Sequence, residues 1–281
     1  MFAGESGTAP AGPRIARPSS FVALGDSFTE GMDDPYPDGT FRGWADLLAG
    51  HLAATPGPEL RYANVAVRGK KIDEVLAEQL PAALAMRPDL VSFAAGINDA
   101  MRPAFDLDHV AGAQEVAVRA LREAGCEVLL ICYGDPSRRS AVVGRLSDRM
   151  RAYNARTRTL ALDTGSHVMD FWGDALFDDP RCWSVDRLHL SALGHDRVAR
   201  AAAEVLGHGD SSWRAPLPPA EPAAWVHRRR ADWDWTVTHF GPWVARRIRG
   251  IRSGEGIEPK LPMLTPVSSM GGCVSAGLVN Q

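Results

Sequence analysis

One short stretch near the N-terminus constrains this chain most: an apolar run that ends abruptly on a polar turn. Residues 21–24 read Phe-Val-Ala-Leu, and Gly25, Asp26 and Ser27 follow directly. A few apolar residues closed by a turn signal are typical of a fully buried strand. Because ligands of open α/β sheets bind beyond the carboxyl ends of the strands, we expect Ser27 at the mouth of a site. The alternative is that Asp26 and Ser27 only cap the next helix.

The same pattern recurs along the chain and predicts the fold class. Apolar runs that predict further strands lie at 60–67, 90–94, 128–133 and 167–171. Helical periodicity lies between them at 44–53, 72–86, 110–124, 138–163 and 192–206, with a bend expected near Pro81. Alternating strands and helices predict parallel βαβ units with right-handed crossovers. We therefore predict an α/β fold, a three-layer αβα sandwich around a five-stranded parallel sheet, with the strand order left open.

Composition divides the chain into five parts. They are a mobile tail over residues 1–18, the α/β domain over 19–208, a Pro-rich linker over 209–222, a Trp- and Arg-rich helical arm over 223–252, and a disordered tail over 253–281. The arm either docks on the main domain with its tryptophans buried, or presents a basic aromatic surface to RNA, a membrane or an oligomer partner.

The charge and cysteine content exclude several classes of protein. The 281 residues carry a net charge of −3, which argues against attraction of the whole protein to nucleic acid or to an anionic membrane. Because neither a secretory signal nor 18 consecutive apolar residues is recognised, we expect a cytoplasmic protein without a membrane span. Four cysteines without a CxxC pair support neither a disulfide scaffold nor a structural zinc site, and Cys126 and Cys132, in an apolar run, are predicted to be buried thiols.

Residues that can perform chemistry follow the predicted strands. Ser27, Gly69 and Asn98 come after the first three strands, and Asp186 and His189 lie in the loop after the fifth. Parallel strands end on the same edge of a sheet, so these groups can converge. A serine hydroxyl becomes a nucleophile when a base takes its proton, and histidine suits that task near neutral pH. Asp186 stands three residues before His189, so it can hold the other ring nitrogen locally.

The same residues can stabilise the charge that such a reaction develops. Attack on an ester carbonyl creates an oxyanion, which needs hydrogen-bond donors already aimed at it. The backbone N–H groups of Ser27 and Gly69 and the side-chain amide of Asn98 are available donors. The pattern therefore predicts a serine esterase that acts through an acyl-enzyme intermediate.

Four sequence blocks carry a family resemblance. They are Gly-Asp-Ser at 25–27, Asn-Val-Ala-Val-Arg-Gly at 64–69, Gly-Ile-Asn-Asp at 96–99 and Asp-Arg-Leu-His at 186–189. In this order they resemble the signature blocks of the SGNH hydrolases, also called GDSL esterases and lipases, and the whole chain resembles actinobacterial members. The resemblance implies a flavodoxin-like fold, Ser27 as nucleophile, His189 as base and Asp186 as its partner. It also implies an oxyanion hole formed by Ser27, Gly69 and Asn98.

Two other kinds of site find little support. His195, six residues after His189, suggests a metal site with Asp186, but a third spaced ligand is missing. The turn at residues 25–31 could hold a phosphate, but it lacks the glycine spacing of the nucleotide-binding motifs. We therefore expect neither a cofactor nor a metal ion.

The substrate is expected to be a small-molecule, carbohydrate or lipid ester. Residues 32–40, Arg68, Met101, Arg102 and Trp183 are predicted to line its pocket. Their mixture of polar and aromatic side chains favours a short acyl group on a polar carrier. Two alternatives stay open: an acyltransferase with the same triad, and an esterase-like binding module that uses the arm. The oligomeric state also stays open.

Overall fold

A six-stranded sheet forms the centre of the structure, a computed structural model that describes residues 15–37, 39–138, 143–219, 254 and 256–273. Its strands are β1 (Ser20–Gly25), β2 (Arg61–Asn64), β3 (Leu90–Ala94), β4 (Glu127–Cys132), β5 (His167–Asp170) and β6 (Leu261–Pro266). Their order is β5-β4-β3-β1-β2-β6. The first five strands pair in parallel, and β6 pairs antiparallel with β2. The predicted α/β fold is confirmed, with one strand more than the sequence indicated.

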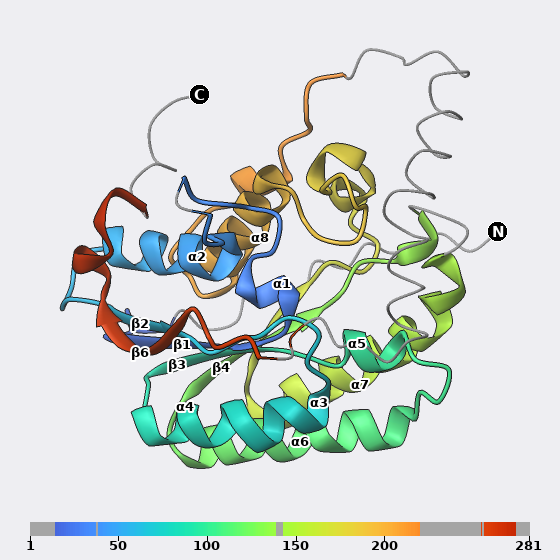
Figure 1. Ribbon diagram of the computed structural model, residues 1–281, viewed down its shortest axis with the longest axis horizontal. Helices are drawn as coiled ribbons and strands as arrows, with labels where there is room; N and C mark the ends of the chain where they lie inside the picture. Colours follow the sequence, from blue (N-terminus) through green and yellow to red (C-terminus); the bar gives the residue numbers. More distant parts are fainter. Residues whose placement is uncertain (1–14, 38, 139–142, 220–253, 255, 274–281) are drawn as a thin grey trace.

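Helices cover both faces of this sheet (Figure 1). On one face lie α2 (Gly43–Ala54) and α8 (Ala192–Val205), which pack against each other. On the other lie α4 (Leu80–Met86), α6 (Leu107–Glu123) and α7 (Ser147–Thr164). The shorter elements are α1 (Ser27–Glu30), α3 (Ile72–Glu74), η1 (Val75–Gln79), α5 (Ile97–Ala100), η2 (Pro136–Arg138), η3 (Val143–Leu146), η4 (Ala175–Asp178), η5 (Pro180–Cys182), η6 (Ser211–Arg214) and η8 (Val267–Cys273). The predicted three-layer sandwich is therefore confirmed.

Local sequence signals explain how two of these helices begin and bend. The Ser191 side chain accepts a hydrogen bond from the backbone N–H of Gly194, so it caps α8, a role that serine commonly has directly before a helix. Near Pro81, where a bend is predicted, the π-helix η1 joins α3 to α4, and Pro81 is the second residue of α4. Proline lacks a backbone N–H and disturbs the regular helical ladder, which is consistent with a wider turn at this point.

The strand order places a topological switch point between β1 and β3. The chain leaves β1 towards β2 on one side and later crosses to β3 on the other. The carboxyl ends of β1 and β3 border the crevice where open α/β sheets bind ligands. Gln79 holds the end of β1 there: its Oε1 accepts from the Gly25 N–H at 2.8 Å, and its Nε2 donates to the Gly25 carbonyl at 2.9 Å. Ser27 therefore follows a fixed strand end.

The C-terminal part of the chain differs from the expectation for residues 253–281. Instead of a disordered tail, β6 pairs Arg61 with Pro266 and Tyr62 with Thr265, and η8 follows it. Pro262 and Pro266 lack an N–H, which an edge strand tolerates. The composition of this segment gave no sign of a strand, because its pairing partner, β2, lies far upstream in the sequence.

The borders of the α/β domain also extend beyond the prediction. Trp213, in the predicted linker, is buried; its ring packs edge-on against Phe171, and its Nε1 donates to Glu204 at 2.6 Å. Near the N-terminus, the Arg17 Nε donates to the Leu52 carbonyl at 2.8 Å, so part of the predicted tail is tied to α2. The predicted arm over 223–252 lies outside the described residues.

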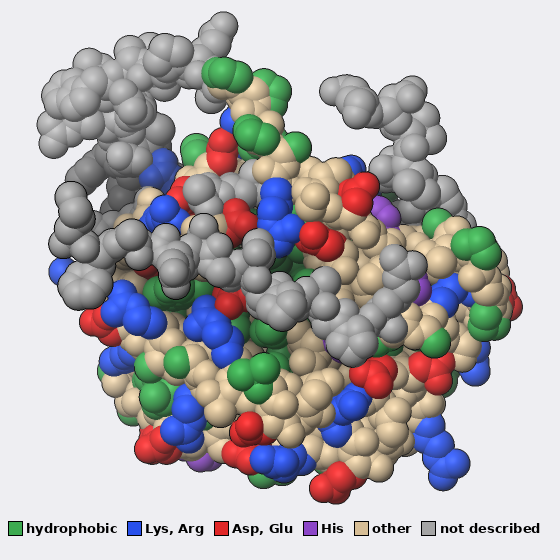
Figure 2. Space-filling model, turned by 180° about the vertical axis from the view of Figure 1, so that it is seen from behind, with side chains coloured by type: hydrophobic (Ala, Val, Ile, Leu, Met, Phe, Trp, Pro, Cys, Tyr) green, Lys and Arg blue, Asp and Glu red, His purple; other side chains and the backbone are tan. Residues whose placement is uncertain are grey.

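The surface and the thiols fit the composition of the chain. Figure 2 shows acidic and basic side chains interspersed on the described part of one face. Cys126 and Cys132 are free and buried, as predicted, and burial raises the pKa of the Cys132 thiol to about 12. Among the described residues, the helices are too short or too polar to cross a membrane.

Candidate active site

The turn after β1 presents a serine hydroxyl at the start of a short helix. Asp26 is the N-cap of α1, because its Oδ1 accepts from the Phe28 N–H at 3.1 Å. Gly25 allows β1 to approach β3 closely: a Cβ at this position would lie 2.4 Å from the Ala94 carbonyl oxygen. The capping task therefore belongs to Asp26, and Ser27 is left to face the neighbouring loop.

That neighbouring loop carries His189 and Asp186. The Ser27 Oγ lies 3.1 Å from His189 Nε2, and His189 Nδ1 lies 2.6 Å from Asp186 Oδ2. The other carboxylate oxygen, Asp186 Oδ1, accepts from the backbone N–H groups of Leu188 and His189, at 2.9 Å each. Between them Arg187 adopts a left-handed conformation with φ of 56°. The three residues that the sequence singled out are thus in one hydrogen-bonded line.

The charges in this line follow from burial and hydrogen bonding. Burial raises the pKa of Asp186, but its hydrogen bonds with His189 outweigh that effect and bring the pKa to about 2. Burial lowers the pKa of His189, but the hydrogen bond and charge of Asp186 raise it above the ordinary value. An ionised Asp186 only accepts, so the proton of a neutral His189 resides on Nδ1. The lone pair on Nε2 then faces the Ser27 hydroxyl.

A second carboxylate, Asp33, stands beside the same imidazole. Its Oδ2 lies 3.8 Å from His189 Nδ1 and accepts a hydrogen bond from the Ser184 hydroxyl at 2.6 Å. Its charge adds to that of Asp186 in raising the pKa of His189. The sequence placed Asp33 only in the predicted pocket loop over 32–40. Its role was missed because Ser184 and His189, its partners, lie far away in the sequence.

Asp33, Asp186 and His189 are also the described residues best placed to hold a metal ion. One candidate ligand atom from each lies within 4.8 Å of the others. However, His189 Nδ1 and Asp186 share a hydrogen bond, and Ser184 donates to Asp33. Binding of a cation would have to break the contact that orients the imidazole.

The loops after β2 and β3 bring hydrogen-bond donors to the same edge. Residues 65–67 run beside β1, with the Val67 N–H donating to the Gly25 carbonyl at 3.3 Å, so Gly69 follows next to the Ser27 turn. Within the described part of the chain, the N–H groups of Ser27 and Gly69 have no acceptor. Asn98 Nδ2 donates to Asp26 Oδ2 and to the Lys70 carbonyl, both at 3.0 Å.

Asp26 is the most deeply buried carboxyl group of this edge. Burial raises its pKa to about 7, although the Phe28 N–H, the charge of His189 and the hydrogen bond from Asn98 all lower it. The hydrogen bond that Asn98 Nδ2 donates to Asp26 fixes the orientation of that amide. Asp26 therefore caps α1 and orients a donor at the same time.

The predicted substrate-binding residues fall into two groups. Arg68 and Trp183 have protein partners: Arg68 forms an ion pair with Glu30 and lies over the Phe41 ring, and Trp183 Nε1 donates to a backbone carbonyl at 2.7 Å. Met101 and Arg102 directly follow α5 and are half-buried. The Arg102 Nε is buried and has no hydrogen-bond partner among the described residues. Two of the four predicted residues, Arg68 and Trp183, are thus already engaged with protein groups.

His195 does not belong to a metal site. Its Nδ1 accepts from the Trp44 N–H and its Nε2 donates to the Met32 carbonyl, both at 3.1 Å. Burial lowers the pKa of this fully buried imidazole to about 4, so it is neutral and both nitrogens are occupied. His195 instead ties α8 to α2 and to the loop that carries Asp33.

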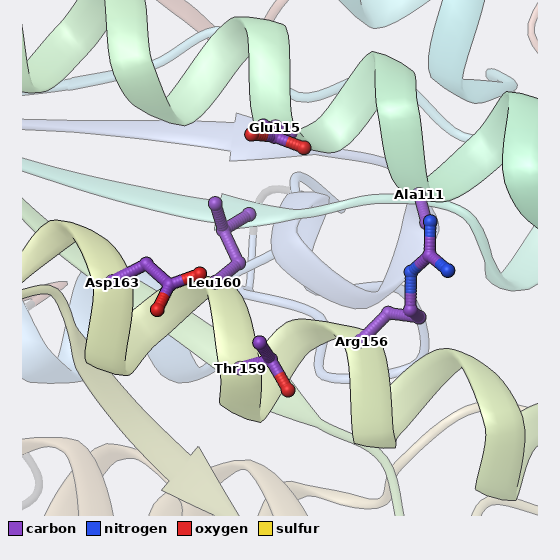
Figure 3. Close-up of a pocket in the computed structure, with 6 residues that line it drawn as sticks. All are labelled: Ala111, Glu115, Arg156, Thr159, Leu160 and Asp163. Carbon is purple, nitrogen blue, oxygen red and sulfur yellow. The ribbon is translucent and has the colours of Figure 1, made fainter.

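A separate hollow of about 70 Å³ lies between α6 and α7 (Figure 3). It is lined by Ala111, Glu115, Arg156, Thr159, Leu160 and Asp163. Pockets for small molecules usually measure about 300–1,000 Å³. The hollow is too small for such a ligand, and the residues of the serine site are absent from its lining. We therefore assign the candidate site to the strand ends around Ser27.

Comparison with known proteins agrees with this geometry. A model of the GDSL-like lipase/acylhydrolase family matches residues 23–197. Over 216 residues the chain is 28% identical to an acetylxylan esterase of Geobacillus stearothermophilus, which covers 69% of this chain and 96% of that protein.

Solved structures share the fold. The crystal structure of an acetylxylan esterase from Geobacillus stearothermophilus matches with a TM-score of 0.57 and 21% identity, over 69% of this chain and 97% of that one. An alpha/beta hydrolase from the metagenome of Lake Arreo, Spain, matches with a TM-score of 0.58 and 24% identity, over the same shares. Structures of the esterase include catalytic mutants in which a serine, an aspartate or a histidine is replaced by alanine. The family match spans more than half of the chain, which therefore belongs to the GDSL-like lipase/acylhydrolase family, the SGNH hydrolases, and is a carboxylic ester hydrolase.

Proposed function

We propose that this hydrolase is a serine esterase that removes short acyl groups through an acyl-enzyme intermediate. The observation that carries the proposal is the hydrogen-bonded line from Ser27 Oγ through His189 to Asp186. Its contacts match the arrangement in which a carboxylate orients an imidazole and the imidazole activates a serine. The catalytic mutants of the Geobacillus esterase concern the same three residue types.

The first half of the reaction acylates the serine. His189 Nε2 takes the hydroxyl proton while Ser27 Oγ attacks the ester carbonyl carbon, and a tetrahedral intermediate forms. The negative charge of Asp186 stabilises the imidazolium. When the intermediate collapses, the carbon–oxygen bond of the leaving group breaks, and His189 returns the proton to the departing alkoxide. The acyl group is then an ester of Ser27.

The second half releases the acid and restores the enzyme. Water gives a proton to His189 Nε2 and attacks the acyl carbonyl, and collapse of the second intermediate returns the proton to Ser27 Oγ. An alcohol in place of water would give acyl transfer with the same residues. Analysis of the products in the presence of an added alcohol separates the two reactions.

Both tetrahedral intermediates carry an oxyanion. The N–H groups of Ser27 and Gly69 lack an acceptor among the described residues and can donate to it. Asn98 Nδ2 supplies the third donor by exchanging its hydrogen bond to the Lys70 carbonyl for one to the oxyanion, while Asp26 keeps the amide in place.

The substrate class follows from the named relative and from the residues at the site. We extend to this chain the acetyl-ester specificity that the name of the Geobacillus enzyme implies. The half-buried Arg102 follows α5, directly after the segment that carries Asn98, so its guanidinium group is placed to meet a polar carrier such as a carbohydrate. Together with Arg68, Met101 and Trp183 it forms the proposed substrate-binding set.

Ser27→Ala tests the nucleophile. We expect kcat for p-nitrophenyl acetate to fall by a factor on the order of 10⁴ to 10⁶, because removing one member of a triad disables the unit. Ser137→Ala, at an exposed serine, is the matched control and should keep full activity. Circular dichroism should show both variants folded. Turnover at the wild-type rate in Ser27→Ala would remove Ser27 from the mechanism.

Asn98→Ala tests the oxyanion donor. Loss of one such donor should lower kcat by a factor of about 10² to 10³ and leave KM nearly unchanged, because the hydrogen bond strengthens only as charge develops. The measurement is steady-state hydrolysis of p-nitrophenyl acetate, together with the thermal midpoint of unfolding. A loss of less than about tenfold would show that the backbone donors suffice.

Asp33→Asn tests the electrostatics of the base. His189 must be neutral to accept a proton, so kcat/KM should rise as the pH increases through its raised pKa. Removing the negative charge of Asp33 makes the imidazolium less stable and lowers that pKa, so the acidic limb of the profile should move to lower pH. Asp163→Asn removes an equal charge on α7, far from the site, and should leave the limb in place. A shift to higher pH in Asp33→Asn would contradict the assignment.

A series of p-nitrophenyl esters tests the acyl specificity. We expect kcat/KM to be highest for acyl chains of about two to four carbons, because half-buried polar groups such as Arg102 offer little apolar surface to a longer chain. A maximum at eight or more carbons would contradict the proposed substrate class and leave the catalytic residues untouched.

A further inference from the structure

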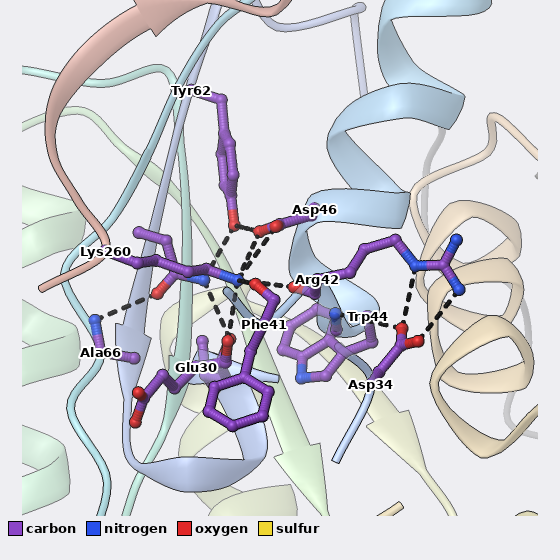
Figure 4. A network of polar contacts seen from close by, with 12 residues as sticks. Glu30, Asp34, Phe41, Arg42, Trp44, Asp46, Tyr62, Ala66 and Lys260 are labelled. Carbon is purple, nitrogen blue, oxygen red and sulfur yellow. Dashed lines mark hydrogen bonds and ion pairs between the residues drawn. The ribbon is translucent and has the colours of Figure 1, made fainter. Parts of the chain in front are cut away.

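Lys260 stands immediately before β6, and its ammonium group enters the α/β domain close to the catalytic loops. It donates to the carbonyl oxygens of Glu30 at 2.7 Å, Phe41 at 2.9 Å and Arg42 at 2.5 Å (Figure 4). It also forms an ion pair with Asp46, 2.9 Å from the nearer oxygen. Only 17% of its side chain is exposed. One cation therefore gathers four acceptors from two separate segments of the chain.

The first acceptor ties Lys260 to the nucleophile turn. Glu30 is the last residue of α1, and Ser27 is the first. Because α1 has only four residues, a contact at the Glu30 carbonyl holds the end of the same turn that presents the Ser27 hydroxyl. Gly31, which follows with φ of 94°, then directs the chain into the next loop.

The second and third acceptors fix the far end of that loop. Phe41 and Arg42 precede α2, and the loop between Gly31 and Phe41 carries Asp33 beside His189. The Arg42 side chain closes the loop further through two hydrogen bonds to Asp34, at 2.9 and 3.1 Å. Lys260 thus holds both ends of the loop that brings Asp33 to the imidazole.

The C-terminal segment also contacts the turn that carries Gly69. The Arg68 N–H donates to the Glu30 carboxylate at 2.7 Å, so the Glu30 held by Lys260 supports the residue before Gly69. Gly254 packs directly against this turn, because a Cβ at position 254 would lie 2.1 Å from the Arg68 carbonyl oxygen. Two separate contacts of the C-terminal segment therefore border the loops around Ser27.

The buried carboxyl group of Asp46 explains why the positive charge of Lys260 is needed at this position. Asp46 is buried, and Tyr62 donates to its Oδ1 at 2.8 Å. Burial raises the pKa of Asp46, and the charge and hydrogen bond of Lys260 lower it. Of the described residues, Lys260 is the one that forms an ion pair with Asp46. Its removal would leave a buried carboxylate without a counter-charge, which is strongly destabilising.

We propose that Lys260 is a positioning residue of the esterase site: from a segment outside the family match at 23–197, it fixes the Ser27 turn, the Asp33 loop and, through Glu30, the Gly69 turn. This inference rests on the proposed function. It assigns to the C-terminal strand a part in catalysis besides completing the sheet.

Comparison of Lys260→Met with the double variant Lys260→Met, Asp46→Asn in the full-length protein tests the proposal. Lys260→Met should lower the thermal midpoint and reduce kcat by about 10- to 100-fold, since a shift of about 1 Å at a site can cost 10² in rate. KM should change by less than about threefold. In the double variant the unpaired buried charge is gone, so the thermal midpoint should recover while kcat stays low. Recovery of both would reduce Lys260 to a structural role and overturn the proposal.

Gly254→Ala provides a second test that leaves Lys260 and Asp46 paired. Its methyl group should displace the Arg68 carbonyl and lower kcat without a large change in KM. Gly112→Ala on α6, where a Cβ would meet no atom within 4 Å and φ is not positive, is the matched control for adding a methyl group away from the site. Wild-type kcat in Gly254→Ala would contradict a part for this segment in positioning the Gly69 turn.

Labelling with a fluorophosphonate, which reacts with an activated serine, distinguishes failure of the proposed function from failure of the positioning role of Lys260. If wild-type protein is not labelled at Ser27, the proposed function fails. If wild-type protein is labelled and Lys260→Met reacts at the same rate, the proposed function stands and the positioning role of Lys260 fails. Slower labelling of Lys260→Met and of the double variant is the expected result.

Discussion

The close approach of β1 and β3 at Gly25 is the constraint on which the site depends. A side chain at this position would collide with the Ala94 carbonyl, and Gln79 binds both backbone polar groups of Gly25. The strand end is therefore rigid, and Asp26 can cap α1 with Ser27 as the first residue of the helix. Because β1 and β3 flank the switch point of the sheet, the serine stands where loops from several strands meet.

Much of this arrangement could be predicted from the sequence because it is encoded locally. The buried run before Ser27 and the spacing of Asp186 and His189 each depend on neighbouring residues, and the structure confirms the strand and the contact. The convergence of Ser27 with His189 needed one further rule, the common edge of parallel strands. The catalytic roles of these residues stay predictions, although their geometry agrees with them.

The features that the sequence did not reveal depend on partners far apart in the chain. β6 exists because β2 offers it an open edge, and a segment with two prolines gives little sign of that pairing. In the sequence, nothing distinguishes Asp33 and Lys260 from other charged residues. The fold places Asp33 beside His189 and Lys260 beside Asp46. In both cases the informative quantity is a distance between side chains, which no spacing in the sequence encodes.

The carboxyl groups around the His189 imidazole link the pH dependence of catalysis to the pH dependence of stability. Asp33 and Asp186 favour the charged imidazolium, so His189 becomes a free base only above its ordinary pKa. Asp26, buried beside them, has a pKa of about 7 in the folded protein against 3.8 as its ordinary value. A group whose pKa is raised by folding gives its full stabilisation below the unfolded value and loses it as the pH rises through the folded value. Rising pH therefore removes stability at Asp26 between pH 3.8 and about 7, and it frees His189 only above the ordinary pKa of an imidazole, so the base is released once most of this stability next to Ser27, the proposed nucleophile, is already lost. The hydrogen bonds from Phe28 and Asn98 offset part of this loss, and they are the contacts that hold the Ser27 turn and the proposed oxyanion donor in place.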